Sequence, residues 1–245
     1  MLKKLLLISS LLLVVGCSMP NFGFTAIRET SYRVKITWLG HAGFMIESNN
    51  NRIYINPYLA AIGSLKGDGI IVSNSGPDLC DQISVSNLAK DDAIIIMPPE
   101  CAARMNLLSI QQLIVGTNYT INNFLIETVH AYHLNGTISR GDGAGLIITV
   151  NGTRIYYAGI TDYIPELSLI NDIDVAIIPI AGSDLSLNLT EAITFLKTLK
   201  ATYNIPMYYG GNTGTTLDVG REFKSMAALQ EVNVTLLSNQ DLLLD

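Results

Sequence analysis

The side chains that could do chemistry are few in this chain. Histidine occurs three times, at His41, His130 and His133. Asp78 lies in the segment 73–79, which reads SNSGPDL and follows a short apolar run. Imidazoles and carboxylates can act as metal ligands or as acid and base in hydrolysis. The chemistry to consider first is therefore a hydrolytic site built on Asp78 and one or more histidines.

The spacing of these residues does not by itself form a site. His130 and His133 are three residues apart, which could bind one metal on a helical turn. We expect a strand running into a loop there, and the two rings then need not face the same way. We expect His41 to hydrogen-bond backbone and fix a turn. Asp78 could brace its own loop through backbone N–H groups, or join His130 and His133 in a metal site.

Two other catalytic patterns are weaker. Ser73 and Ser75 could supply a nucleophile only if a base such as His133 lay within hydrogen-bonding distance. The Gly- and Thr-rich segment 210–216 resembles a phosphate-binding loop, but no lysine follows where such a loop needs one. We therefore expect this segment to be a loop at the rim of a substrate site.

The N-terminus has the pattern of a signal sequence. Two lysines precede the apolar run 5–15, which is too short to span a bilayer as a helix. The following segment 14–17 (VVGC) resembles a bacterial lipobox. That resemblance implies a signal peptide at 1–16, a lipidated Cys17 and a tether at 17–32, although an uncleaved anchor helix is the alternative. We expect attachment to the bacterial cell envelope, on the periplasmic face of the outer membrane in a Gram-negative cell.

Composition limits the partners and the domain count. The chain of 245 residues has a net charge of −6, which argues against a nucleic-acid partner. No later segment has 18 uninterrupted apolar residues, so we expect 33–245 to form one domain outside the bilayer. Cys80 and Cys101 could form a disulfide in an oxidising compartment or remain separate buried thiols.

Apolar periodicity predicts strands in the first half of this domain and alternating strands and helices in the second half. Asn151-Gly152 predicts a tight hairpin turn. Asn188 and Glu191 have the spacing of a helix capping box. Strands are predicted at 33–39, 44–48, 52–55, 70–72, 94–97, 123–129, 145–150, 153–157, 175–178, 205–209 and 232–237, and helices at 188–200 and 221–230.

The motifs together resemble a known family. Segment 36–47 (ITWLGHAGFMIE), followed by 52–59 (RIYINPYL), is similar to the opening of metallo-β-lactamase-fold hydrolases. The branch that it resembles is the ascorbate-6-phosphate-lactonase-like group of metal-dependent hydrolases. Further matches follow in the family's order at 131–133, 145–162, 173–182 and 206–210. The resemblance implies an α/β fold, a four-layer αββα sandwich with the site at one edge.

The family's metal ligands are largely replaced. In its T-H-x-H-x-D-H motif, the three histidine positions hold Asn74, Gly76 and Leu79, and only Asp78 remains. The resemblance places a ligand histidine at His133. Three further positions of the family's site are also replaced. Asn56 stands where the family has an aspartate, Ile160 where it has the bridging aspartate, and Tyr208 where it has the final histidine.

These replacements predict a pseudoenzyme. We expect a membrane-anchored lipoprotein that lacks the two-metal site, needs no cofactor and binds an unknown small molecule or envelope protein. The alternative is a divergent metal-dependent hydrolase, lactonase-like or phosphoesterase-like, that uses Asp78 and His133 and holds one zinc or manganese ion weakly. A structural protein of the envelope is a third interpretation.

Overall fold

The structure is a computed structural model that describes residues 33–58, 63–107, 109–182, 186–210, 216–237 and 241–245. These residues belong to one compact unit, Tyr32–Asp245, which is separate from Met1–Ser31. Cys17 lies outside the described residues, so the lipid attachment, the tether and the envelope location stay predictions. None of the helices in the described ranges is long and apolar enough to cross a membrane.

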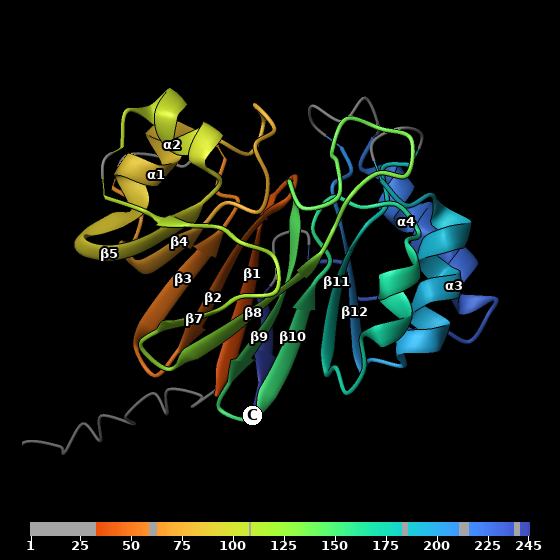
Figure 1. The fold of residues 1–245 in the computed structure, drawn as a ribbon. Helices are drawn as coiled ribbons and strands as arrows, with labels where there is room; N and C mark the ends of the chain where they lie inside the picture. Colours follow the sequence, from red (N-terminus) through yellow and green to blue (C-terminus); the bar gives the residue numbers. More distant parts are fainter. Residues whose placement is uncertain (1–32, 59–62, 108, 183–185, 211–215, 238–240) are drawn as a thin grey trace, which may run out of the picture. The chain divides into compact units, whose positions relative to one another are not determined.

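Two mixed sheets face each other in the middle of this unit (Figure 1). Sheet A has seven strands in the order β13-β1-β2-β3-β4-β5-β6. The first four strands in that order pair antiparallel with one another, and the strands from β3 to β6 pair parallel. The strands are β1 (Val34–Gly40), β2 (Gly43–Ser48), β3 (Asn51–Ile55), β4 (Gly67–Ile71), β5 (Ala89–Met97), β6 (Gln111–Gln112) and β13 (Asp241–Leu244).

Sheet B has six strands in the order β12-β11-β10-β9-β8-β7. The three strands at the β12 end are parallel, and the remaining pairs are antiparallel. Pro206 is accommodated because β12 pairs with β11 alone, and an edge strand can spare one N–H group. The strands are β7 (Asn118–Ile121), β8 (Phe124–His130), β9 (Ala144–Val150), β10 (Thr153–Tyr157), β11 (Val175–Pro179) and β12 (Tyr203–Met207).

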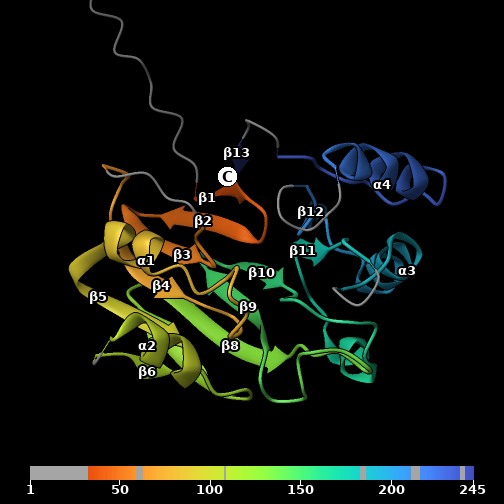
Figure 2. The ribbon, with the colours of Figure 1, turned by 90° about the horizontal axis from the view of Figure 1, so that it is seen from above.

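The helices lie on the outer sides of the two sheets (Figures 1 and 2). The helices α3 (Leu189–Leu199) and α4 (Asp218–Ala228) pack on sheet B through an apolar cluster of their own. The helices α1 (Gln82–Leu88) and α2 (Pro99–Met105) lie beside β4 and β5 of sheet A. With the short 3-10 helix η1 (Pro165–Leu169), these elements form the predicted αββα sandwich. The predicted fold class is confirmed.

Local sequence explains several of these elements. Asn151-Gly152 turns β9 into β10, and both residues have positive φ angles of 48° and 81°. The Asn188 side chain accepts from Glu191 N–H, and Glu191 returns a bond to the Asn188 backbone, so the capping box of α3 is present.

One predicted strand is wrong. Residues 232–237 are apolar at alternate positions, and Val232, Val234 and Leu237 are buried, but the segment forms no ladder. Val232 N–H donates to Ala227 C=O and Thr235 N–H donates to Asn204 C=O, so isolated bonds and buried side chains rather than strand pairing hold the segment. The last strand is β13, which pairs antiparallel with β1. The pattern marked burial correctly but could not name the partner.

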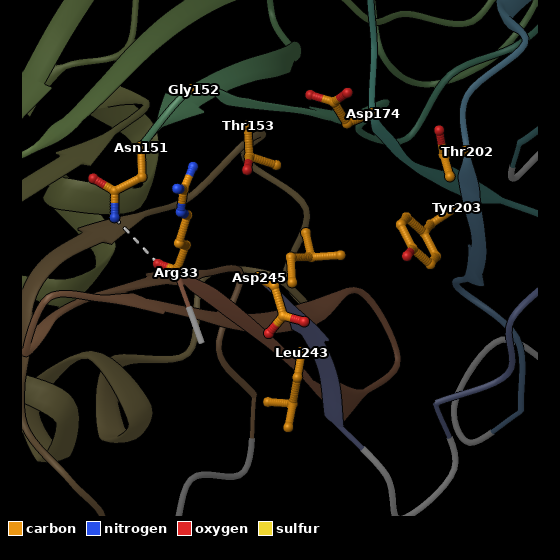
Figure 3. A pocket seen from close by; sticks show the side chains of 10 residues that line it. Arg33, Asn151, Gly152, Thr153, Asp174, Thr202, Tyr203, Leu243 and Asp245 are labelled. Carbon is orange, nitrogen blue, oxygen red and sulfur yellow. Dashed lines mark hydrogen bonds between the residues drawn. The ribbon is translucent and has the colours of Figure 1, made fainter. Parts of the chain in front are cut away.

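The sandwich has two edges, and we name them by their contents. The asparagine edge carries the β2–β3, β7–β8 and β9–β10 turns, together with the C-terminal end of the chain at the bottom of Figure 1. A hollow of about 500 Å³ opens there, lined by residues such as Arg33, Thr153, Tyr203 and Asp245 (Figure 3). The opposite edge, the site edge, carries the β1–β2 turn and the segments that follow β4 and β12.

Candidate active site

The site edge brings together three side chains that are far apart in the sequence. His41 lies in the β1–β2 turn, Asp78 in the segment after β4, and Tyr208 directly after β12. Asp78 Oδ2 lies 2.8 Å from His41 Nε2 and accepts a hydrogen bond from the Tyr208 hydroxyl at 3.0 Å. We call these three residues the Asp78 clamp. One carboxylate oxygen is thus held from sheet A and from sheet B at once.

The clamp favours an ionised carboxylate. Burial acts to raise the pKa of Asp78, but the His41 ring and the Tyr208 hydroxyl outweigh it, so the pKa lies below its ordinary value. Burial and the negative Asp78 raise the pKa of Tyr208, which keeps the phenol protonated as a donor. Because an ionised carboxylate only accepts, His41 Nε2 must be the donor in its bond to Asp78.

His41 and Tyr208 have unusual backbones. Their φ angles are 53° and 59°, in the left-handed region that bulky residues rarely adopt. Tyr208 N–H donates to His41 C=O at 2.9 Å, and Trp38 Nε1–H donates to the same oxygen at 3.0 Å. The rings of His41 and Tyr208 lie 4.6 Å apart. The surrounding bonds therefore fix two strained residues in the positions that Asp78 needs.

A buried amide supports the edge from below. Asn56, at a φ of 44°, accepts from Ser73 N–H at 2.7 Å through its side-chain oxygen. Its amide donates to Ser73 Oγ at 2.8 Å and to the Tyr157 hydroxyl at 2.6 Å. Tyr157 in turn donates to Ala42 C=O at 3.0 Å. Where the family resemblance expects an aspartate, Asn56 thus joins the β1–β2 turn to the segment that carries Asp78.

The segment 73–80 is also tied covalently. Cys80 and Cys101 form a disulfide that joins this segment to α2, with Cα atoms 5.5 Å apart. Both sulfur atoms lie near Asn74 C=O, at 3.7 and 3.6 Å. Asn74 Oδ1 accepts from Gly76 N–H at 2.8 Å, so this side chain caps its own loop. The open question of whether the two cysteines pair is answered in favour of a disulfide.

The other predicted positions take no part in the hydrogen bonds of the clamp. Leu79 and Ile160 are buried in the same apolar cluster between the sheets, with 1% and 3% of their surfaces exposed. Gly76 lies against Asp78 and Asn74, since an added Cβ would meet their side-chain oxygens at 2.8 and 3.0 Å. His133 donates its backbone N–H to Ile138, and its ring lies against Gly136. His130 ends β8 and faces the edge of Tyr132.

Sequence reasoning missed how the edge is connected. His41 was expected to bind backbone, yet its ring binds Asp78, 37 positions away. Asn56, Trp38 and Tyr157 were not recognised as supports. Asn56 precedes a proline and replaces an expected aspartate, which is the one local signal that could have drawn attention to it.

The donor set does not fit the two-metal centre of the related hydrolases. Such a centre needs several imidazoles and a bridging carboxylate. Here Leu79 and Ile160 fill two ligand positions with hydrocarbon, and the Tyr208 phenol donates to Asp78. Within the described ranges, no group of three or more His, Cys, Asp or Glu residues could hold an ion. These residues therefore do not provide the ligands of a two-metal centre.

Comparisons with known proteins agree with the fold and identify its family. A model of the beta-lactamase superfamily domain matches residues 35–208. The chain is 30% identical over 229 residues to a UPF0173 metal-dependent hydrolase of Pelotomaculum thermopropionicum, covering 84% of this chain and 97% of the relative. A relative of the same name from Anoxybacillus flavithermus is 28% identical over 196 residues, covering 72% and 86%. A metallo hydrolase from Ignicoccus hospitalis superposes with a TM-score of 0.69 at 20% identity, covering 86% and 99%.

These relatives correct two expectations. The interpretation as a non-catalytic, membrane-anchored binding protein is contradicted, because the relatives are named as hydrolases; the divergent hydrolase agrees better with them. The expectation that no cofactor is needed is also contradicted, because the names state metal dependence. The matched model and the similarity to the Pelotomaculum protein over most of both chains show that this chain belongs to the metallo-β-lactamase superfamily, among the UPF0173 metal-dependent hydrolases.

Proposed function

We propose that this protein is a divergent hydrolase that cleaves a small ester, lactone-like or phosphoester-like, at the site edge. The observation that carries the proposal is the Asp78 clamp. The Asp78 side chain is 28% exposed, whereas that of His41 behind it is 7% exposed. A carboxylate that two donors hold in place and that is still partly exposed can meet a substrate and a water molecule.

The clamp defines what each residue does. Asp78 accepts a hydrogen bond from the attacking water and orients it, because its lowered pKa keeps it ionised, a form that accepts hydrogen bonds but is a weak base. His41 and Tyr208 keep that carboxylate ionised and in place. Asn56 and the Cys80–Cys101 disulfide hold the segment that carries Asp78. Such positioning lowers the barrier by fixing the reacting groups before the reaction.

A hydrolysis assay tests the proposal. The purified protein would be offered γ- and δ-lactones, aryl acetates and aryl phosphate esters, without added metal and with zinc or manganese. We expect hydrolysis of at least one class, and a loss of roughly 100-fold in kcat in the isosteric variant Asp78→Asn. Hydrolysis by neither form under any metal condition, or equal activity of the two forms, would contradict the proposal.

Metal content is measured on the same samples. The relatives' names imply a metal ion, whereas the described donor set lacks the ligands for two. Our alternative prediction of one weakly bound zinc or manganese ion agrees with the relatives' names but requires an ion held by fewer than three such side chains of the described ranges. Mass spectrometry of the native protein after zinc or manganese addition would decide it. Two tightly bound ions for each chain would show that the donor set has been underestimated.

A further inference from the structure

His41 and Tyr208 approach Asp78 from the two different sheets, and their positions depend on each other. The backbone bond from Tyr208 N–H to His41 C=O, at 2.9 Å, joins the end of β12 to the β1–β2 turn. Their side chains then meet on one oxygen, Asp78 Oδ2. A shift of either residue therefore also shifts the other residue, which donates to the same carboxylate.

We propose that His41 and Tyr208 are positioning residues that fix Asp78 as an anion, and that this anion makes the site select uncharged esters over phosphate esters. This inference rests on the proposed hydrolase function and adds the substrate class. In the family's pattern the Tyr208 position carries a histidine ligand, which implies a cation beside Asp78. Here a neutral phenol takes that position.

The charge of the partly exposed Asp78 carboxylate decides the selectivity. A dication at this place would attract a phosphate group, whereas a fixed carboxylate repels it. Because the Asp78 clamp is partly buried, water and salt screen this repulsion less than at an exposed surface. An uncharged acetate ester or lactone meets no such repulsion and can accept hydrogen bonds at the same edge.

Arg104 of α2 is a cation beside segment 73–80. Its guanidinium donates to Ser75 C=O and to Cys80 Sγ, on the side of the segment that faces α2. It is therefore engaged by backbone and by the disulfide. The charge in the clamp itself therefore comes from the ionised Asp78 carboxylate.

The clamp can be tested without any turnover. Side-chain ¹⁵N spectra of the wild-type protein should show His41 protonated at Nε2, with a downfield proton typical of a bond to a carboxylate. The signal is assigned by its loss in His41→Asn. We expect it to shift upfield in Asp78→Asn and to persist in Tyr209→Phe, a change at the neighbouring tyrosine that stacks on Trp38 instead. A His41 ring protonated only at Nδ1 would overturn the clamp.

Selectivity is measured with probes that share a size or a leaving group. Inorganic phosphate and γ-butyrolactone would be titrated against the His41 signal. We expect phosphate to bind Asp78→Asn about tenfold more tightly than wild type, with lactone affinity changed about twofold or less. Phosphate binding that is as tight in wild type as in the variant would overturn the selectivity.

Turnover separates this inference from the function on which it rests. We expect phenyl acetate but not phenyl phosphate to be hydrolysed, after correction for spontaneous hydrolysis. Tyr208→Phe should lower kcat about tenfold with KM within about twofold, and Tyr208→His, which keeps a donor, should recover part of the loss. Tyr209→Phe should match wild type. Preference for phenyl phosphate would overturn the inference and leave the hydrolase standing. No turnover of the two esters or of the lactones would contradict the hydrolase, and the spectra would still decide the clamp.

Discussion

The two edges of the sandwich are closed by different chemistry. At the asparagine edge, amide side chains join the turns of the two sheets: Asn49 to Asn151 at 3.2 Å, Asn51 to Asn123 at 2.9 Å and Asn122 to Asn51 at 3.0 Å. At the site edge, the same task of joining the sheets falls to His41, Asp78 and Tyr208. One edge uses neutral amides that are exposed or partly buried, and the other uses a partly buried charge.

The backbone differs in the same way. Asn49, Asn50, Asn122 and Asn151 have left-handed φ angles, which asparagine tolerates in turns at small cost. His41 and Tyr208 adopt the same region, where bulky residues cost about 1–3 kcal/mol each. Simple turns would have served to connect the strands. The costly residues are at the edge with the clamped carboxylate, so the strain lies where the geometry of the clamp requires it.

The largest difference between the two edges is expected when one glycine at each edge is replaced by alanine, which adds a single methyl group. Gly159, after β10, has a φ of 72°, and an added Cβ would lie 2.6 Å from Ala144 C=O. We expect Gly159→Ala to lower the free energy of unfolding by about 4 kcal/mol, since left-handed strain and a backbone overlap add together. Urea denaturation followed by circular dichroism measures it.

Gly152 is the matched control at the asparagine edge. Its φ is 81°, but an added Cβ would meet nothing within 4 Å. We expect Gly152→Ala to cost about 1 kcal/mol, from the backbone conformation alone. Equal costs for the two variants would mean that the site edge is no more tightly packed than the turns.

Sequence could predict the asparagine edge better than the site edge. Asn151-Gly152 carries its turn in two adjacent residues, and the Asn188–Glu191 box is equally local. The clamp joins residues 37 and 130 positions apart, and nothing near His41 or Tyr208 predicts a left-handed backbone. Family resemblance supplied the positions of Asp78 and Tyr208, but their mutual hydrogen bond depends on how the two sheets meet.

Removing the disulfide should weaken the site edge selectively. Cys80 and Cys101 are 21 residues apart, so their bond restricts the unfolded chain as well as tying segment 73–80 to α2. We expect the double change Cys80→Ala and Cys101→Ala to cost about 3 kcal/mol in free energy of unfolding. Amide exchange should rise around Asp78 and stay unchanged at Asn151. Faster exchange at both edges would show that the bond stabilises the whole sandwich.

Asn56 tests the polar support of the clamp. Asn56→Ala removes the acceptor of the buried Ser73 N–H and leaves alanine at a φ of 44°. We expect a loss of about 2 kcal/mol in the free energy of unfolding, from the unmet backbone donor and the backbone strain. The His41 Nε2 proton signal should broaden in this variant, because the segment that presents Asp78 loses its anchor. A sharp, unshifted signal would separate Asn56 from the clamp.

The smallest effect is expected from the same substitution at the asparagine edge. Asn151 donates to Ser48 Oγ at 2.6 Å and accepts from Asn49 at 3.2 Å, in contacts that water can replace. We expect Asn151→Ala to cost about 1 kcal/mol, most of it from the left-handed φ of 48°. Asn151→Gly, which removes the amide but suits that φ, should recover most of the loss in the same urea titration. If Asn151→Gly instead cost as much as Asn56→Ala, the amide network would join the sheets as firmly as the clamp does. The strained backbones of His41 and Tyr208 could then no longer be explained by a difference between the two edges in how the sheets are joined.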